Sequence, residues 1–219
     1  MTLVVTGTPT GESSWYREAF AASAKAMDGA NIVRYRHGIP ASVPTLIGIA
    51  GFKQSGKDTL ATGLCAALQL PQDSFAAPLR EFVARLLGYT LGELEVLKEK
   101  PVDWLDGITP RHMMQTIGTE WGRDMIHGEL WVRSLLNRLA GGGVISDVRF
   151  VNEAEEILKR GGCVIRVDRP GTGQGDGHVS ETPLPDHLVS FHVVNNGSKV
   201  ALVGSALLAL QEWGLRDGA

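Results

Sequence analysis

Residues 45–60, TLIGIAGFKQSGKDTL, join an apolar run to a glycine-bounded turn and the start of a helix. The apolar run ends at Gly51, and Gly56 and Lys57 follow after a spacer of four residues. Glycines let the backbone approach an anion closely, and a helix N-terminus offers N–H groups and the positive end of its dipole. The stretch therefore predicts a phosphate-binding loop, with Lys57 as the mobile charge that follows the transferred phosphoryl group.

The residue after the lysine departs from the usual form of this motif. Asp58 stands where a Ser or Thr normally holds magnesium, and Thr59 comes one position later. The alternative interpretation is a glycine-rich turn with an incidental lysine. The apolar strand before the loop and the helical pattern after it favour the phosphate-binding interpretation.

Length and composition predict one domain with an appendage. The chain has 219 residues, 43% of them hydrophobic, and a net charge of −3 from 21 basic and 24 acidic side chains. The acidic balance argues against a surface that coats nucleic acid. We find no signal peptide and no apolar run that would span a bilayer, so we expect a cytoplasmic protein. Cys65 and Cys163 lie in apolar patterns and are expected to be buried reduced thiols, with a disulfide as the alternative.

Residues 1–44 precede the phosphate loop and are expected to form an N-terminal, β-α-β-like extension. Its predicted parts are a strand at 3–6, a helix at 15–27, a strand at 32–35 and a linker at 37–44. The rest of the chain, 45–219, forms the main domain. Its charged segment 88–108 is a candidate lid or insertion, with a surface helix and loop as the alternative.

The main domain alternates predicted strands and helices. Leucines recur every four residues from Leu60 to Leu68, which indicates a helix with one buried stripe. The alternation predicts an α/β fold with a parallel, doubly wound sheet and ligands at the carboxyl ends of its strands. The further predicted elements are strands at 74–75, 144–150, 163–167 and 191–194, and helices at 78–87, 110–121, 129–139, 151–160 and 198–213.

Charged side chains gather where predicted strands end and helices begin. Asp147 is expected to end the third core strand, where an acidic residue commonly steadies magnesium or its water shell. Arg149 and Glu153 follow, as part of the same cluster or as a salt-bridge pair at the helix start. Trp131 either stacks on a base or belongs to the core. The cations available for phosphate contacts are Lys53, Lys57, Arg80, Lys98, Arg111, Arg123 and Arg149.

Several separated motifs, taken together, resemble the bacteriophage-type deoxynucleoside monophosphate kinases, which have the P-loop NTPase fold. The resemblance covers about residues 45–213. Its motifs, in order, are GFKQSGKDT at 51–59, AAPLR at 76–80, PRHMMQTIGTE at 110–120, LWVR at 130–133, SDVRFVNE at 146–153, DRPG with HVSE at 168–181, and VVNNGS at 193–198. The resemblance implies a three-layer α/β/α architecture around the predicted sheet.

The resemblance also implies a role for individual residues. ATP phosphates would be bound by Gly51, Ser55, Gly56, Lys57, Asp58 and Thr59, and Mg²⁺ would be held near Thr59 and Asp147. The residues expected in catalysis are Lys57, Lys53, Arg149 and Arg111. The acceptor nucleotide would be bound by Lys53, Leu79, Arg80, Lys98, Arg111, Gly118, Thr119, Trp131, Asp147, Arg149 and Glu153.

The implied reaction is phosphoryl transfer from ATP to a deoxynucleoside 5′-monophosphate, and a homodimer is the implied assembly. No general base is needed, because the acceptor phosphate oxygen is already ionised at neutral pH. Three alternatives stay open at this point. They are another small-metabolite kinase of the dephospho-coenzyme A or phosphomevalonate type, a nucleotide-dependent switch, and a nucleic-acid end kinase, which the acidic charge disfavours.

Overall fold

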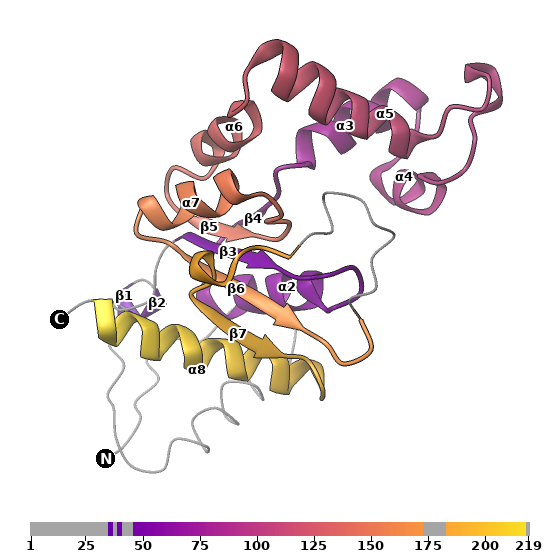
Figure 1. Cartoon of the computed structure of the whole chain (residues 1–219). Helices are drawn as coiled ribbons and strands as arrows, with labels where there is room; N and C mark the ends of the chain where they lie inside the picture. Colours follow the sequence, from indigo (N-terminus) through magenta and orange to yellow (C-terminus); the bar gives the residue numbers. More distant parts are fainter. Residues whose placement is uncertain (1–34, 37–38, 41–45, 173–182, 218–219) are drawn as a thin grey trace. The chain divides into compact units, whose positions relative to one another are not determined.

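The computed structural model describes residues 35–36, 39–40, 46–172 and 183–217 (Figure 1). The described residues divide into two compact units, one formed by those up to Gln72 together with those from Gly141 onward, and the other by Asp73–Ala140. The predicted strand at 3–6 and helix at 15–27 lie outside the described residues.

The first unit is built on a five-stranded sheet with the strand order β4-β5-β3-β6-β7. β3 pairs in parallel with β5 and with β6, and β6 pairs in parallel with β7. The chain extends the sheet on one side of β3 and then crosses to the other side, which confirms the predicted doubly wound α/β sheet. The strands are β3 (Leu46–Ala50), β4 (Gln72–Asp73), β5 (Gly143–Ile145), β6 (Cys163–Asp168) and β7 (Phe191–Val194). The helices are α2 (Lys57–Leu68), α7 (Val151–Lys159), α8 (Lys199–Asp217) and the short 3₁₀ turn η4 (Asp186–Leu188).

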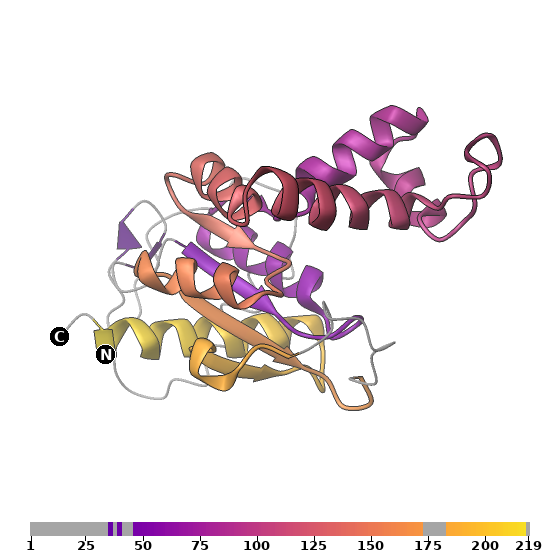
Figure 2. The ribbon, with the colours of Figure 1, turned by 45° about the horizontal axis from the view of Figure 1, so that its top comes forward.

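Side chains that alternate along β3 show which helices cover each face of the sheet. Ile47 and Ile49 are fully buried in one core with the apolar stripes of α2 and α8. Gly48 faces the opposite way, because a Cβ placed there would lie 2.8 Å from Ile157 of α7. Helices therefore flank both faces of the strands (Figure 2), and the expected three-layer α/β/α arrangement is confirmed within this unit.

The second unit is helical after Asp73. Its small core joins Val83 and Ala84 of α3 to Leu94 of α4, with Met113 and Ile117 packed against them. The elements are α3 (Ala77–Leu87), α4 (Leu91–Leu97), the 3₁₀ turn η1 (Asp103–Leu105), α5 (Pro110–Thr116), the π-helix η2 (Ile117–Ile126) and α6 (Leu130–Arg138).

The expected lid segment, 88–108, contains a regular helix with its own cap. Thr90 accepts a hydrogen bond from the backbone N–H of Glu93 at 3.1 Å, and the Glu93 carboxylate accepts one from the Thr90 N–H at 2.8 Å. Hydrogen bonds from the backbone and side chain of Thr90 lower the pKa of Glu93. This capping box fixes the start of α4, and movement of the segment as a lid stays a prediction.

Two predicted strands and one predicted linker differ from the structure. The short strand expected at 74–75 is β4, at Gln72–Asp73, and the strand expected over 144–150 ends already at Ile145. In the predicted linker 37–44, Ile39–Pro40 form β2, which pairs antiparallel with β1 (Tyr35–Arg36). Both strands of a two-stranded ribbon are edge strands, so Pro40 removes no bond from a central ladder.

Both cysteines are free thiols, so the disulfide alternative does not hold. Burial raises the pKa of Cys65 to about 11, and burial also raises the pKa of Cys163. Cys163 is buried as expected, whereas Cys65 is only partly buried. Both side chains are therefore protonated at neutral pH and act as packing groups.

None of the helices in the described ranges combines the length and the hydropathy that spanning a bilayer requires.

The turn between α7 and β6 leaves no room for a side chain at Gly162. A Cβ there would lie 2.6 Å from the carbonyl oxygen of Leu46 and 2.9 Å from that of Ile157. These carbonyl oxygens can move away from a new Cβ only if the backbone is distorted. We therefore expect Gly162→Ala to lower the free energy of unfolding by about 1–3 kcal/mol, measured in urea titrations. The matched control is Gly197→Ala, whose Cβ would meet Ala201 at an ordinary 3.6 Å. Equal stability of the two variants would contradict this packing argument.

Candidate active site

The turn from β3 into α2 follows a path that depends on its two glycines. Gly51 has φ of 139° and Gly56 has φ of 104°, values that side chains with a Cβ rarely adopt. Between them, Gln54 also lies in the left-handed region with φ of 64°. The loop therefore wraps back on itself before the helix begins, as the spacing of the motif predicts.

Close neighbours also require glycine at both positions. A Cβ at Gly51 would lie 2.5 Å from the carbonyl oxygen of Val167 in β6. A Cβ at Gly56 would lie 2.4 Å from the side-chain nitrogen of Asn195, which directly follows β7. The loop is thus held against the carboxyl ends of two strands, and a side chain at either glycine would displace it.

The N-terminus of α2 has the properties of an anion site. Gly56 is its N-cap in a left-handed conformation, and no side chain caps the helix there. The first turn of any α-helix has N–H groups without partners inside the helix, and the dipole favours negative charge at this end. The glycine-bounded loop and this helix end together form a site that suits phosphate groups.

Lys57 lies over the loop that precedes it. Its Nζ donates a hydrogen bond to the carbonyl oxygen of Phe52 at 2.6 Å, and the backbone N–H of Ser55 donates to the same oxygen at 3.2 Å. The Ser55 side chain is fully buried, and its hydroxyl is the one buried side-chain polar atom in the described ranges that lacks a hydrogen-bond partner. A buried hydroxyl without a partner is uncommon in proteins, and this one lies inside the phosphate loop beside Gly51.

The remaining predicted residues of the loop differ in exposure. Lys53 and Asp58 are exposed, and Thr59 is half-buried in the first turn of α2. Asp147 is also half-buried and lies two residues beyond the end of β5 rather than on the strand. Because β5 is the neighbour of β3 in the parallel sheet, Thr59 in the helix that follows β3 and Asp147 in the loop that follows β5 both lie at the carboxyl edge of these strands.

Glu153 acts as a helix cap in this structure. Its side chain is 2% exposed, and one carboxylate oxygen accepts hydrogen bonds from the backbone N–H groups of Arg149 at 2.9 Å and Phe150 at 3.1 Å. These bonds fix the turn from β5 into α7, and the Arg149 side chain is exposed there. Glu153 thus supports the turn that carries Asp147 and Arg149.

Leu79 and Arg80 belong to α3 in the second unit. Leu79 is buried, and a Cβ at Gly118 would lie 3.2 Å from its side chain. Arg80 is half-buried and donates a hydrogen bond to the Ser74 hydroxyl at 2.6 Å. Leu79 is therefore a core residue of this unit, while Arg80 is a cation held by a hydroxyl at the start of the helix.

Lys98 and Arg111, the two basic residues around the 88–108 segment, both have carboxylate partners. Lys98 forms an ion pair with Glu95, and Arg111 forms one with Glu99. The backbone N–H of Arg111 also donates to the carbonyl oxygen of Lys98 at 2.9 Å, which brings the two basic residues side by side. The carboxylates of both pairs are exposed, so an anionic ligand can compete for these cations.

The helix predicted from Pro110 to Trp121 changes its winding partway. It is α-helical to Thr116 and continues as the π-helix η2, in which the backbone bonds connect residues five apart. Trp131 of α6 is 8% exposed, and its indole N–H donates to the carbonyl oxygen of Gly118 at 2.8 Å. A Cβ at Gly122 would lie 2.5 Å from the same ring. Of the two interpretations of Trp131, the structure favours the core.

The predicted site residues divide between the two units. The structure brings together the phosphate loop and the Asp147–Glu153 turn in the first unit. In the second unit it brings together Leu79, Gly118 and Trp131, with Thr119 exposed on the π-helix. The side chains of Arg80, Lys98 and Arg111 bond instead to Ser74, Glu95 and Glu99.

Two residues that contact the phosphate loop had no role in the sequence interpretation. Asn195 donates from its side chain to the carbonyl oxygen of Ser55 at 2.7 Å, and Arg169 donates to that of Gln54 at 3.3 Å. Both lie inside motifs quoted above, DRPG and VVNNGS. Their position close behind the predicted strands 163–167 and 191–194 was the available signal, because strand ends of a parallel sheet share one edge.

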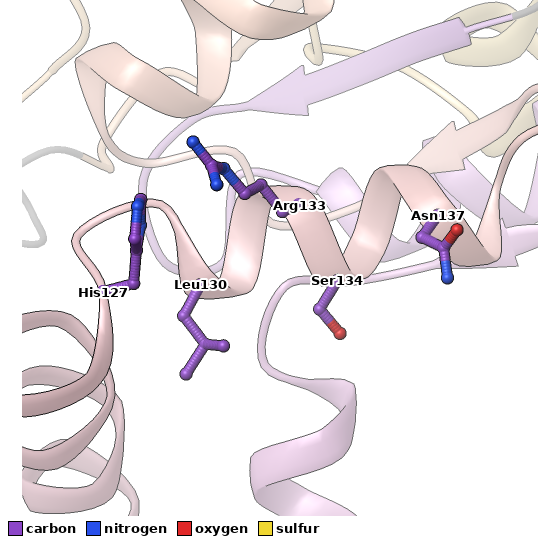
Figure 3. A pocket seen from close by; sticks show the side chains of 5 residues that line it. All are labelled: His127, Leu130, Arg133, Ser134 and Asn137. Atoms are coloured by element: carbon purple, nitrogen blue, oxygen red, sulfur yellow. The ribbon is translucent and has the colours of Figure 1, made fainter.

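An open pocket of about 540 Å³ lies along α6 in the second unit, lined by His127, Leu130, Arg133, Ser134 and Asn137 (Figure 3). In that view His127 and Arg133 point to one side of the helix, and Leu130 and Ser134 point to the other. The Ser134 hydroxyl already accepts a hydrogen bond from Arg138 at 2.8 Å. The polar groups do not converge on one point, so this pocket is a poor candidate for a binding site.

The Trp131 indole is expected to hold the π-helix in its winding. Trp131→Phe removes the hydrogen bond to Gly118 and leaves that carbonyl without its partner, which should cost about 1–3 kcal/mol of unfolding free energy. Amide hydrogen exchange should also become faster within η2. Trp121→Phe is the matched control, because that ring is 47% exposed. If exchange in η2 is unchanged in Trp131→Phe, the indole does not hold the π-helix.

Comparisons with known proteins place the chain among nucleotide kinases. Residues 90–204 match the family described as deoxynucleotide monophosphate kinase. A protein of Acanthamoeba polyphaga mimivirus, which carries that name provisionally, is 38% identical over 169 residues, covering 68% of this chain and 86% of its own. Deoxynucleoside-5′-monophosphate kinase of Escherichia phage T5 is 32% identical over 100 residues, covering 40% of each chain.

A solved structure, shikimate kinase from Aquifex aeolicus vf5, aligns over 79% of this chain and 99% of its own. Its TM-score of 0.46 and identity of 17% are too low to bear on function. The sequence matches are stronger, since the family match spans more than half of the chain and the mimivirus relative covers more than two thirds of it. The phosphate loop, the doubly wound sheet and these matches agree: the chain belongs to the deoxynucleotide monophosphate kinase family.

Proposed function

We propose that the protein transfers the γ-phosphoryl group of ATP to a deoxynucleoside 5′-monophosphate, giving ADP and the deoxynucleoside diphosphate. The observation that carries the proposal is the phosphate loop with Lys57 folded over it at the start of α2, in a chain of this family. The names of the mimivirus and phage relatives support the acceptor class.

In this proposal the first unit binds the donor. The N–H groups of the loop and of the first turn of α2 receive the phosphates of ATP, from Gly51 through Thr59. Lys57 exchanges its bond to the Phe52 carbonyl for the phosphoryl group in transfer. Lys53, exposed within the loop, and Arg149, exposed after β5, supply further positive charge to the migrating group.

The magnesium that ATP brings would be held by few protein groups. Thr59 offers a hydroxyl and Asp147 a carboxylate at the same edge of the sheet, and phosphate oxygens and water would complete the shell. In the described ranges no three His, Cys, Asp or Glu side chains gather as a metal site. Magnesium is usually bound through one or two carboxylates together with substrate phosphates. The ion would neutralise charge on the phosphates of the donor.

The second unit carries the residues proposed for the acceptor. Arg80, Lys98 and Arg111 are the candidate phosphate contacts, and Lys98 and Arg111 would exchange their glutamate partners for the acceptor phosphate. Arginine suits this role, because its planar fork makes two parallel hydrogen bonds to a phosphate. Leu79, Gly118, Thr119 and Trp131 would shape the surface beneath the nucleoside, with Trp131 acting through Gly118.

Catalysis in this scheme consists of positioning and charge neutralisation. The acceptor oxygen is already ionised at neutral pH, so the protein needs no side chain to remove a proton. In-line geometry and the cations around the phosphoryl group lower the barrier, and closure must exclude water to prevent hydrolysis of ATP. Segment 88–108 stays our candidate for that closure.

Other assignments from the sequence stay proposals as well. We take residues 45–219 as the kinase domain and 1–44 as an extension of it. The cytoplasmic location and the homodimer implied by the resemblance also remain predictions.

Lys57→Ala tests the donor site. We expect turnover to fall by about 10²–10³-fold, the loss typical for removing one preorganised donor from a transition state, with the far-UV circular dichroism unchanged. Lys159→Ala is the control, because its side chain is 77% exposed on α7. Near-normal turnover in Lys57→Ala would contradict the assignment of the loop.

An acceptor panel separates the proposal from its alternatives. ADP release is followed with ATP and each deoxy- and ribonucleoside monophosphate, and with dephospho-coenzyme A and phosphomevalonate. We expect one or more deoxynucleoside monophosphates to stimulate ADP release. Dephospho-coenzyme A and phosphomevalonate should not stimulate it. Slow ATP hydrolysis that no acceptor stimulates would instead indicate a nucleotide-dependent switch.

A further inference from the structure

Side chains from outside the phosphate loop hold two consecutive carbonyl groups of the loop. Asn195 donates to the Ser55 carbonyl at 2.7 Å, and Arg169 donates to the Gln54 carbonyl at 3.3 Å. Asn195 is the first residue after β7, and Arg169 is the first after β6. The loop is therefore held by the ends of two strands that lie beyond β3 in the sheet.

The bond to Ser55 also sets the direction of the next backbone N–H. A trans peptide is planar, and its carbonyl and N–H groups point in opposite directions. The described residues contain no cis peptide. When Asn195 holds the Ser55 carbonyl, the N–H of Gly56 must point away from Asn195. The Gly56 N–H, at the N-terminus of α2, is thus oriented before a ligand binds. This orientation reduces the conformational entropy that binding would otherwise cost.

Asn195 is itself held firmly. Its backbone N–H donates to the carbonyl oxygen of Asp168 at 2.7 Å. The Asp168 carboxylate is in turn bonded on one oxygen to His192 at 2.8 Å and on the other to Arg166 at 3.1 Å. The side-chain nitrogen of Asn195 also occupies the space that a Cβ on Gly56 would need. The side-chain amide of Asn195 is therefore held in one position against the loop.

We infer that Asn195 is a positioning residue for the phosphates of ATP, acting through the Ser55–Gly56 peptide rather than by touching the ligand. Arg169 assists it by holding the preceding peptide. The inference rests on the proposed function, because ATP is the ligand whose phosphates the loop would hold. Asn196, the next residue, is exposed and should have no comparable part.

The test compares Asn195→Ala and Asn195→Asp with the matched control Asn196→Ala. Binding of Mg–ATP without acceptor is measured by titration calorimetry, and the KM of ATP and of the acceptor by ADP release. For Asn195→Ala we expect the Kd and KM of ATP to rise about three- to tenfold, as losing one hydrogen bond predicts, with the acceptor KM unchanged. Asn195→Asp should lose at least as much, because a carboxylate cannot donate to Ser55 and repels phosphate.

A merely structural role would give a different pattern. It would lower the melting temperature and the fraction of binding-competent protein while leaving the Kd of ATP in that fraction unchanged, and this result would overturn the inference. If Asn195→Ala does not fold, Arg169→Ala replaces it, because the Arg169 side chain is exposed. Weaker ATP binding by Arg169→Ala supports the inference that side chains bonded to the loop carbonyls position the loop. Unchanged ATP binding overturns it. If the unmutated protein binds no Mg–ATP, the proposed function itself fails; if it binds and the variants match it, only the inference fails.

Discussion

A loop that turns its N–H groups toward an anion must turn carbonyl groups outward, and those carbonyls need partners. The Ser55 carbonyl is held by Asn195 and the Gln54 carbonyl by Arg169. Gly51 lies so close to the Val167 carbonyl, and Gly56 so close to the Asn195 side chain, that a Cβ at either position would clash. The order of strands in the sheet supplies these partners, because β6 lies beside β3 and β7 lies beside β6. The anion site at the head of α2 therefore depends on the parallel sheet behind it.

The loop and its sheet could be predicted because their signals are local. The apolar run of β3, the two glycines and the leucine stripe of α2 lie within one short stretch, and each dictates its own conformation. The position of Asn195 and Arg169 near strand ends was visible in the sequence, but their contacts with the loop could not be predicted, because they span 140 and 115 positions of the chain. Glu153 lies between these cases. Its place three residues into α7 fits a capping residue, and the structure shows that role, whereas the family resemblance placed it in the expected nucleotide site.

The helical unit was harder to predict from sequence, for a different reason. An amphipathic pattern indicates a helix but hardly distinguishes α from π winding over one or two turns. We expect the change at Ile117 to depend on Trp131, whose indole donates to the Gly118 carbonyl and whose ring fills the space beside Gly122. Trp131 lies in the next helix, so its effect on η2 appears only when both helices are packed. The same packing explains why this tryptophan is a core residue although its motif suggested contact with a base.

The central claim is that the γ-phosphoryl group of ATP moves to a deoxynucleoside monophosphate. The most direct measurement follows a radiolabel from the γ-position of ATP in the presence of each deoxynucleoside monophosphate, with the products separated by chromatography. The proposal predicts that the label appears in a deoxynucleoside diphosphate, in amounts equal to the ADP released. Label released only as inorganic phosphate, with every deoxynucleoside monophosphate recovered unchanged, would contradict it.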